Sequence, residues 1–386
     1  MLSVNLTKGN IKLGFIILFF ITSTYVFAQS GASRTSLYLD LLKSKKVGVV
    51  ANQTSVINTT HLVDTLLSLN INITKIFTPE HGFRGGYSAG EKIQDGLDLK
   101  TGIPLISLYG ANKKPTEENL NEIDIMLFDI QDIGVRFYTY ISTLHYVMEA
   151  CAEKNISLIL LDRPNPNRHY IDGPVLKKEF KSFVGMHPVP IVYGMTIGEY
   201  GLMINGERWL LNGIDCHLEV IPLEPGFNFF DYQLPIKPSP NLPNDRAINL
   251  YPSLCLFEGT NVSVGRGTSM PFQIYGAPYF SDSLFQFIPE PNAGAKNPKY
   301  NGINCFGFDL SRHKILRELN LEFIINAFDD CAEKDDFFNS FFNKLTGNDL
   351  LQKQIKEGAT QDQIKMSWQK DLQEFKRTRE KYLIYP

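Results

Sequence analysis

The sequence predicts an α/β fold: a Rossmann-like, doubly wound parallel sheet followed by a smaller α+β domain at the C-terminal end. From Lys45 onward, short apolar runs alternate with segments of helical periodicity, which is typical of β-α-β units. The runs are almost continuously apolar, as parallel strands are when helices cover both faces of a sheet. A chain of 386 residues is also longer than one ordinary hydrophobic core requires, so two domains are expected.

The elements of the first domain can be placed in order along the chain. Strands are expected at residues 47–51, 73–77, 104–109, 123–128, 157–161 and 216–221, and helices at residues 61–69, 140–154 and 195–211. Thr196 is suited to cap the last of these helices. The proline-rich stretch at residues 235–243 suits a crossing between domains, so we place the domains at residues 40–235 and 236–386. The second domain is expected to end in an amphipathic helix at residues 361–382.

Residues 1–28 are typical of a secretory signal peptide. Lys8 and Lys12 precede an apolar run at residues 13–26, and Ala28 provides a small residue for cleavage. We therefore expect an exported protein, periplasmic or extracellular, with no stable membrane partner after cleavage. The run is too short for a comfortable membrane span, and an uncleaved anchor is the alternative. The five cysteines are scattered and odd in number, which favours buried thiols over a disulfide framework.

Composition and missing motifs argue against several classes of protein. The net charge of −3 gives no electrostatic argument for nucleic acid as a partner. Residues 52–55 (NQTS) follow the first strand, where a dinucleotide-binding protein would have its glycine-rich turn, so we expect no nicotinamide, flavin or other cofactor. The serine-hydrolase motif Gly-x-Ser-x-Gly and the zinc-peptidase motif His-Glu-x-x-His are both absent.

Side chains suited to chemistry follow several of the expected strands, at the point where each strand ends. They are Glu80, His81 and Arg84 after the second strand, Asp129, Asp132, Arg136 and Tyr138 after the fourth, and Asp162, Arg163 and Asn165 after the fifth. Because the carboxyl ends of parallel strands meet along one edge of the sheet, we expect these side chains to surround one pocket. Polar turns are the alternative, but Asp, Glu, Arg and His are not the usual turn residues.

Paired carboxylates make hydrolysis of a glycosidic bond the favoured chemistry. One carboxylic acid must protonate the leaving oxygen, and a second carboxylate usually acts as base or nucleophile. Glu80, in a loop bounded by glycines, is the leading candidate for the acid. The candidates for the second group are Asp129, Asp132, Asp162 and Glu258, and we favour Asp132. The alternative for Asp132 is a buried pair with an arginine at the start of the following helix.

Further candidates for substrate binding lie later in the chain. Prolines fix an extended backbone at residues 185–194, which would bring His187 and Tyr193 to the same edge of the sheet, although a core strand with a satisfied histidine is equally consistent. Asn241, Glu258, Asn261 and Arg266 form the polar clusters of the second domain. For Asn241 the alternative is a turn residue. For Glu258, with Asn261 and Arg266, the alternative is a structural ion pair. A metal site built from Glu80, His81, Asp132 and His187 is another alternative, but we expect no metal.

Five of these segments also resemble a known family. They are residues 79–85 (PEHGFRG), 129–140 (DIQDIGVRFYTY), 161–166 (LDRPNP), 189–196 (VPIVYGMT) and 258–268 (EGTNVSVGRGT). In this order they are similar to the sequence blocks of the NamZ-type exo-β-N-acetylmuramidases. The resemblance extends from about Lys45 to the C-terminus, without large gaps.

The resemblance implies an enzyme that removes terminal N-acetylmuramic acid from the non-reducing end of peptidoglycan fragments. It also implies a Rossmann-like catalytic domain, a smaller C-terminal domain and an active-site glutamate at Glu80. Muramic acid carries a lactyl carboxylate, and its chemistry suits a bidentate ion pair with Arg136, Arg163 or Arg266. Two other functions are consistent with the same residues: a non-enzymatic periplasmic sugar receptor, and a metal-dependent amidase or esterase of the cell wall.

Overall fold

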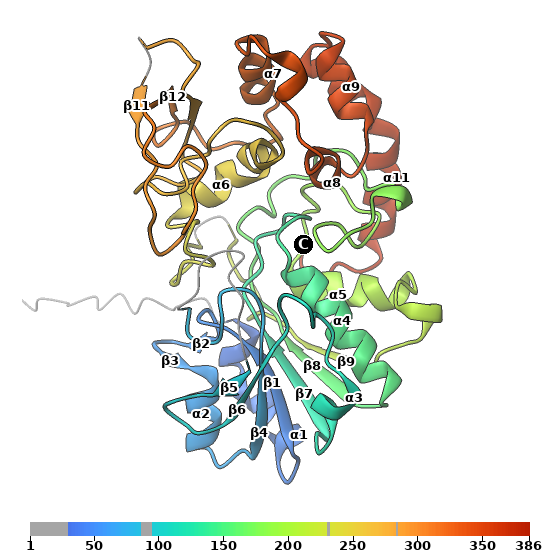
Figure 1. The fold of residues 1–386 in the computed structure, drawn as a ribbon. Helices are drawn as coiled ribbons and strands as arrows, with labels where there is room; N and C mark the ends of the chain where they lie inside the picture. Colours follow the sequence, from blue (N-terminus) through green and yellow to red (C-terminus); the bar gives the residue numbers. More distant parts are fainter. Residues whose placement is uncertain (1–29, 86–94, 230–231, 283–284) are drawn as a thin grey trace, which may run out of the picture.

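The first domain is built on a seven-stranded sheet with the strand order β5-β6-β4-β1-β7-β8-β9. The computed structural model describes residues 30–85, 95–229, 232–282 and 285–386, so the predicted signal peptide lies outside the described residues. The strands are β1 (Val47–Ala51), β4 (Ile73–Thr78), β5 (Gly96–Leu97), β6 (Pro104–Ser107), β7 (Ile125–Asp129), β8 (Ser157–Leu161) and β9 (Leu218–Ile221). Neighbouring strands are parallel except for β5 and β6. The order reverses between β1 and β7, as in a doubly wound sheet, which confirms the predicted fold class (Figure 1).

Helices cover both faces of this sheet. Successive side chains of a strand point to opposite faces, so the apolar side chains of a strand such as β7 need a partner on each side. In β7, Met126 and Phe128 belong to one hydrophobic cluster and Ile125 and Leu127 to another. The first cluster includes helices α4 (Tyr140–Glu153) and α5 (Ile197–Gly206). The second includes α1 (Leu39–Leu42) and α2 (Leu62–Ser68). The remaining elements of this domain are the hairpin β2 (Val56–Ile57) and β3 (Thr60–His61) and the short helix α3 (Glu117–Leu120).

Thr196 caps helix α5 as the sequence predicts. Its hydroxyl accepts a hydrogen bond from the backbone of Glu199 at 3.2 Å, and the Glu199 carboxylate accepts one from the backbone of Thr196 at 2.9 Å. This reciprocal arrangement satisfies two amide groups that a helix start would otherwise leave unpaired. The helix ends earlier than expected, at Gly206, because the chain turns through Arg208 with a φ of 56°.

The second domain combines a small antiparallel sheet with helices. Its sheet has the order β10-β12-β11, with β10 (Ile274–Ala277), β11 (Phe285–Phe287) and β12 (Cys305–Asp309). Its helices are α6 (Asp245–Leu254), α7 (Glu322–Asp329), α8 (Phe342–Thr346), α9 (Leu350–Lys356), α10 (Gln361–Ser367) and α11 (Gln369–Glu380). The single helix predicted for residues 361–382 is wrong. Two helices meet at Trp368, where the indole is buried and donates to the Asp172 carboxylate at 3.1 Å.

The C-terminal segment returns to the first domain and lies between the two domains (Figure 1). The Tyr385 hydroxyl donates to Asp162 at 2.6 Å, next to the carboxyl end of β8. The backbone amides of Ile384 and Tyr385 both donate to the buried Glu199 carboxylate. One hydrophobic cluster contains residues from both domains, among them Tyr140 and Trp368. The two domains are therefore joined by a common core and by the end of the chain.

The cysteines and the hydropathy of the helices bear on the remaining sequence predictions. All five cysteines are buried and unpaired as disulfides, as the scattered spacing indicates. Among the helices of the described residues, none has the length and hydropathy that crossing a bilayer requires.

Tyr385→Phe tests the contact between the C-terminal segment and Asp162. Burial raises the pKa of Asp162 from 3.8 to about 7, so the carboxylate is mostly ionised only at higher pH, where a lost donor matters most. We expect the free energy of unfolding to fall by about 1–3 kcal/mol at pH 8, and by less at pH 5. Urea denaturation at the two pH values measures this difference.

Tyr382→Phe is the matched control, because the Tyr382 hydroxyl donates at 2.7 Å to Glu207 near the surface. Contacts of that kind contribute less than about 1 kcal/mol. Equal destabilisation by the two variants, or no dependence on pH for Tyr385→Phe, would contradict the interpretation.

Candidate active site

A pocket lies at the carboxyl ends of β4 and β7, and both domains form its walls. The loop after β4 contributes Glu80 and His81, and the loop between β7 and α4 contributes Phe137, Tyr138, Thr139 and Tyr140. The crossing segment contributes Ser239 and Asn241, and the second domain contributes Tyr251, Arg266 and Phe272. The cavity has a volume of about 450 Å³, part of it open to solvent. The strand order of the sheet reverses beside this pocket, at the place where ligands of such sheets bind.

A tight turn brings Glu80 to the pocket. His81 is buried and has a φ of 74°, and the Gly82 amide closes the turn by donating to the Pro79 carbonyl at 3.1 Å. A left-handed backbone at a non-glycine residue is strained, and such residues cluster at functional sites. Beyond the turn, Phe83 is buried in the cluster around α2. The loop is thus fixed on both sides of the glutamate.

Arg84 anchors the same loop to the edge of the sheet. Its guanidinium donates to both oxygens of Asp98 at 2.9 Å each and forms a further ion pair with Asp64 at 3.2 Å. Arg84 does not line the pocket. The structure therefore places this predicted substrate-binding residue behind the glutamate loop.

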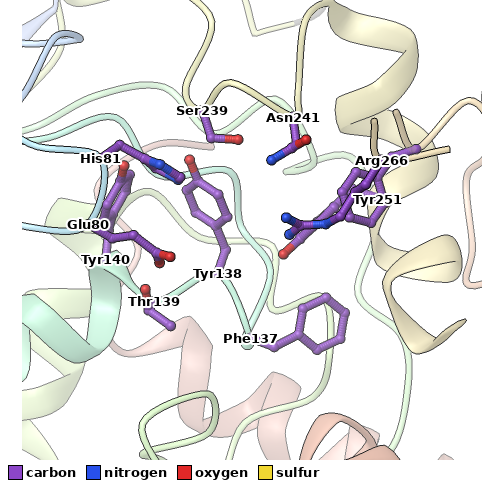
Figure 2. A pocket seen from close by; sticks show the side chains of 11 residues that line it. Glu80, His81, Phe137, Tyr138, Thr139, Tyr140, Ser239, Asn241, Tyr251 and Arg266 are labelled. Atoms are coloured by element: carbon purple, nitrogen blue, oxygen red, sulfur yellow. The ribbon is translucent and has the colours of Figure 1, made fainter. Parts of the chain in front are cut away.

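Figure 2 shows the Glu80 carboxylate and the Arg266 guanidinium on opposite walls of the pocket. Aromatic rings form much of the surface between them. Tyr138 makes edge contacts with Tyr140 and Tyr251, with ring centroids 4.9 Å and 6.0 Å apart. Flat apolar faces framed by polar groups suit a sugar ring.

The crossing segment is tied to this aromatic wall through a single carbonyl. The Pro238 oxygen accepts hydrogen bonds from the Tyr138 hydroxyl at 2.9 Å, the Tyr140 hydroxyl at 3.4 Å and the Gln53 amide at 3.0 Å. Burial, and next the negative charge of Glu80, raise the pKa of the Tyr140 hydroxyl. Both tyrosines therefore stay protonated and continue to donate at neutral pH.

Asp132, which the sequence favours as the second catalytic carboxylate, lies outside the lining of the pocket. It is 2% exposed. One of its oxygens accepts hydrogen bonds from the Tyr193 hydroxyl and, at 2.7 Å, from the Gly134 amide. The other oxygen has no hydrogen-bond partner among the described residues. Burial raises the pKa of Asp132 to about 6.

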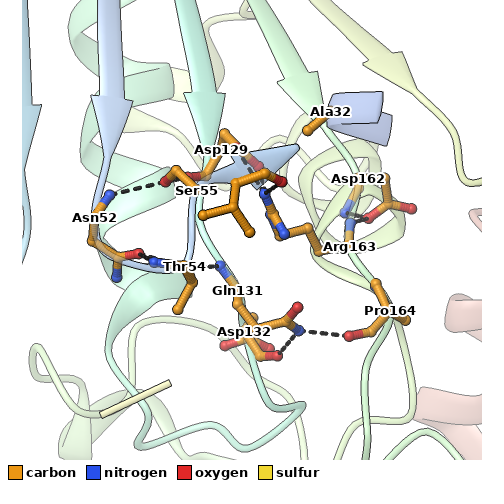
Figure 3. A network of polar contacts seen from close by, with 12 residues as sticks. Ala32, Asn52, Thr54, Ser55, Asp129, Gln131, Asp132, Asp162, Arg163 and Pro164 are labelled. Atoms are coloured by element: carbon orange, nitrogen blue, oxygen red, sulfur yellow. Dashed lines mark hydrogen bonds and ion pairs between the residues drawn. The ribbon is translucent and has the colours of Figure 1, made fainter. Parts of the chain in front are cut away.

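Asp129 and Arg163 form a buried ion pair at the carboxyl ends of β7 and β8. The arginine contacts both carboxylate oxygens, at 2.5 Å and 2.8 Å, and also donates to the Val56 carbonyl. Figure 3 shows the surrounding network, in which Thr54 accepts from the Gln131 amide and the Gln131 side chain donates to the Pro164 carbonyl. These bonds connect the loops after β1, β7 and β8, so the network holds the carboxyl ends of these strands together.

Asp162, Asn165 and His187 are buried outside the lining of the pocket, and Glu258 and Asn261 are partly exposed and do not line it either. Asp162 accepts from Tyr385, Thr196 and two backbone amides. Asn165 donates to the Met195 carbonyl. His187 stacks on Trp209 and bonds to Tyr200 and His145. In the second domain, Glu258 pairs with Arg266, and Asn261 accepts from the Tyr279 hydroxyl.

Arg136 is also interior, and its surroundings are carbonyl oxygens rather than a ligand site. Its guanidinium donates to the carbonyls of Pro174 and Val189 at 2.7 Å each, of Leu345 at 2.9 Å and of Thr346 at 2.7 Å. Its exposed fraction is 0%. The lining of the pocket thus includes five of the predicted residues: Glu80, His81, Tyr138, Asn241 and Arg266.

Reasoning from sequence missed other residues of the pocket: Phe137, Thr139, Tyr140, Ser239, Tyr251 and Phe272. The first three belong to the motif at residues 129–140, so their signal was present beside Tyr138. Tyr109 was also missed. Burial and next the Glu80 carboxylate raise the pKa of its hydroxyl, which places that hydroxyl close to the glutamate.

The four residues of the alternative metal site are not gathered in one place. Glu80 and His81 line the pocket, whereas Asp132 and His187 have the buried partners described above. Within residues 30–85, 95–229, 232–282 and 285–386, no group of three or more His, Cys, Asp or Glu side chains is arranged to hold a metal ion.

Two protein-family models together match almost all of the chain from residue 47 onward. The model of the N-terminal domain of the exo-β-N-acetylmuramidase NamZ matches residues 47–246, and the model of the C-terminal domain of NamZ matches residues 249–385. The chain belongs to the NamZ exo-β-N-acetylmuramidase family. The resemblance inferred from the five motifs is therefore confirmed.

Individual relatives agree with this NamZ assignment. A Bacillus subtilis (strain 168) protein named peptidoglycan β-N-acetylmuramidase NamZ is 40% identical over 372 residues, which cover 90% of this chain and 89% of that protein. Crystal structures of two DUF1343 family proteins from Bacteroides fragilis NCTC 9343 are also similar. One has a TM-score of 0.85 and 44% identity and covers 92% of this chain and 98% of its own. The other has a TM-score of 0.77 and 27% identity and covers 93% and 99%.

Asp132→Asn tests whether the buried carboxyl titrates as its surroundings indicate. Its folded-state pKa of about 6 lies above the ordinary value of 3.8, so wild type loses stability as the pH rises from about 4 to 6. Asparagine does not ionise. We expect the stability of the variant relative to wild type to rise by up to about 3 kcal/mol across this window, as measured by urea denaturation at pH 4.5 and 7.5.

Asp98→Asn serves as the control, because the pKa of Asp98 is shifted down and that of Asp132 is shifted up. The Arg84 guanidinium holds the pKa of Asp98 down at about 2, so that group is ionised throughout the measured range. No rise between pH 4.5 and 7.5 is expected for Asp98→Asn, and a flat profile for Asp132→Asn would contradict its interpretation.

Proposed function

We propose that this protein is an exo-acting glycosidase that releases N-acetylmuramic acid from the non-reducing end of peptidoglycan fragments. The proposal is supported by membership of the NamZ family and by the name of the Bacillus subtilis relative. The observation that carries it is the position of Glu80, whose carboxylate faces a pocket with aromatic and polar walls at the reversal of strand order. Glu80 also lies in one of the motifs on which the family resemblance rests.

In this proposal Glu80 is the general acid. It donates a proton to the glycosidic oxygen while the bond from that oxygen to C1 breaks, so that the leaving sugar departs as a neutral alcohol. The oxygen of a water molecule then bonds to C1 and loses a proton, which gives free N-acetylmuramic acid. The rigid turn at His81 and the anchors at Phe83 and Arg84 keep the carboxyl in place during this transfer. Preorganisation of this kind keeps the reacting groups close to the geometry of reaction.

The other walls of the pocket suit an N-acetylated sugar. The rings of Tyr138 and Tyr251 offer apolar faces to the carbon side of the pyranose. Thr139, Ser239 and Asn241 provide hydroxyl and amide groups for the ring hydroxyls and the acetamido group. Asn241 is held by its own donation to the Gly294 carbonyl at 2.7 Å.

Glu80→Gln tests the role of Glu80 directly. We expect kcat to fall about 10²- to 10⁴-fold on a β-linked disaccharide with N-acetylmuramic acid at its non-reducing end, with KM nearly unchanged. The loss should be smaller on a nitrophenyl β-N-acetylmuramide, because that leaving group depends less on protonation. Release of free N-acetylmuramic acid measures both reactions.

Parallel samples separate the alternatives. Asp132→Asn assayed on the same substrates shows whether a carboxyl outside the pocket lining takes part in catalysis. A chelator-treated sample tests the metal-dependent amidase or esterase. Full activity of Glu80→Gln would remove Glu80 from the mechanism, and binding without turnover by folded wild type would indicate a receptor.

We also propose that the protein is exported. The predicted signal peptide supports this proposal. Mass spectrometry of the protein isolated from its native host should find Gln29 as the first residue of the mature chain, and a chain that retains residues 13–26 would instead indicate the anchored alternative.

A further inference from the structure

The proposed substrate carries a carboxylate on its lactyl group, and the structure distinguishes among the three arginines considered as its partner. Arg136 is fully buried and donates to four backbone carbonyls. Arg163 is 3% exposed and is occupied by Asp129. Arg266 lines the pocket, and its side chain is 27% exposed. Only Arg266, of these three, can reach a ligand without a rearrangement of the core.

The guanidinium of Arg266 is held along one edge and is open along the other. Its Nε lies 2.6 Å from a Glu258 oxygen, and its Cζ lies 5.5 Å from the centre of the Phe272 ring. Neither Nη atom donates to any acceptor in the part of the chain that the structure describes. Figure 2 shows these nitrogens directed into the pocket, toward the side that holds Glu80.

The backbone around Arg266 leaves little freedom. Gly265 and Gly267 have φ values of 73° and 85°, and an added Cβ would lie 2.4 Å from Ile274 at the first and 2.7 Å from the Glu290 carbonyl at the second. Glycine is required at both positions for conformational and steric reasons. The arginine is therefore presented by a rigid turn, which reduces the entropy lost when it orders a ligand.

Positive charges outnumber negative ones on the wall of the pocket that holds Arg266. Glu258 compensates one positive charge, but Lys299 lies close enough to interact with both Glu258 and Arg266. Its ammonium group donates to the carbonyls of Val262 at 2.9 Å and of Thr260. Burial lowers the pKa of Lys299 to about 8, so it is mostly charged at neutral pH. On this wall two cations face the single carboxylate of Glu258, and the Glu80 carboxylate lies on the opposite wall, so the Arg266 side is where a ligand carboxylate is favoured.

We propose that Arg266 determines specificity by binding the lactyl carboxylate on C3 of the terminal N-acetylmuramic acid. Glu258 holds one edge of the guanidinium, and the two Nη atoms bind the ligand carboxylate along the other edge. This inference rests on the proposed function. The scissile oxygen on C1 and the lactyl group on C3 point in different directions from the ring, which matches the positions of Glu80 and Arg266 on opposite walls. The arginine thereby distinguishes muramic acid from N-acetylglucosamine, which lacks the lactyl group.

The test compares three nitrophenyl β-glycosides: N-acetylmuramide, the same compound with its lactyl carboxyl converted to an amide, and N-acetylglucosaminide. For Arg266→Gln, we expect kcat/KM on the N-acetylmuramide to fall about 10- to 100-fold, mainly through KM. The values on the two neutral compounds should change by less than about threefold. Arg266→Lys should lie between wild type and Arg266→Gln, because a lysine cannot form the bidentate contact.

Two further variants control for indirect effects. In Glu258→Gln/Arg266→Gln no carboxylate is left without its partner, so the same substrate pattern there excludes the unpaired Glu258 as the cause. Arg208→Gln removes an arginine that contacts only the Gly213 carbonyl among the described residues, and it should change nothing. Equal losses on all three substrates, or no loss on the N-acetylmuramide, would overturn the inference.

Calorimetric binding of free N-acetylmuramic acid and N-acetylglucosamine separates this inference from the proposed function. Weaker binding of N-acetylmuramic acid alone by Arg266→Gln supports the role of Arg266 even if wild type turns over no substrate. If folded wild type hydrolyses the N-acetylmuramide but Arg266→Gln binds both sugars as wild type does, the inference fails and the proposed function stands.

Discussion

The fully buried guanidinium of Arg136 connects the parts of the molecule that form the pocket. It lies one residue before the aromatic segment Phe137–Tyr140 and donates to carbonyls from the loop after β8 and from the end of α8. Burial lowers its pKa, yet an arginine stays protonated inside proteins, and four carbonyl dipoles stabilise its charge. Gly347 shows how closely the chain surrounds it, since an added Cβ there would lie 2.7 Å from an Nη atom. A shift between the domains would take away the Leu345 and Thr346 carbonyls, which are two of the four acceptors of this cation.

The pocket depends on that connection because neither domain forms it alone. Glu80 and the tyrosines belong to the sheet domain, whereas Arg266 and Phe272 belong to the other. The Asp129–Arg163 pair connects the ends of β7 and β8, just as Arg136 connects the two domains. Two buried arginines therefore have structural roles, and the arginine on the pocket wall remains open to solvent and to a ligand. Among these three arginines, burial therefore distinguishes the two structural side chains from the one that is available to a ligand.

The fold class could be predicted from the sequence because it follows from apolar periodicity and strand spacing, and both can be read from residues that are neighbours in the chain. The sequence also placed Glu80 correctly at the pocket, since the position after a strand follows from the same pattern. It could not show the direction of each side chain. Asp129 ends β7, and Asp132 and Tyr138 follow it, yet of these three only Tyr138 lines the pocket. The break at Trp368 was missed for a related reason, because the bond from its indole to Asp172 joins residues 196 positions apart.

The contact between Tyr385 and Asp162 has a consequence for the way the chain matures. The carboxylate at the end of β8 receives one of its donors from the second-last residue of this sequence. A ribosome adds residues in chain order, at about 5–20 residues per second. A nascent sheet domain therefore has all its strands for several seconds before Ile384 and Tyr385 are made. During that time Asp162 has its donors from Thr196 and Gly198 but not the one from Tyr385, and Glu199 lacks the amides of Ile384 and Tyr385.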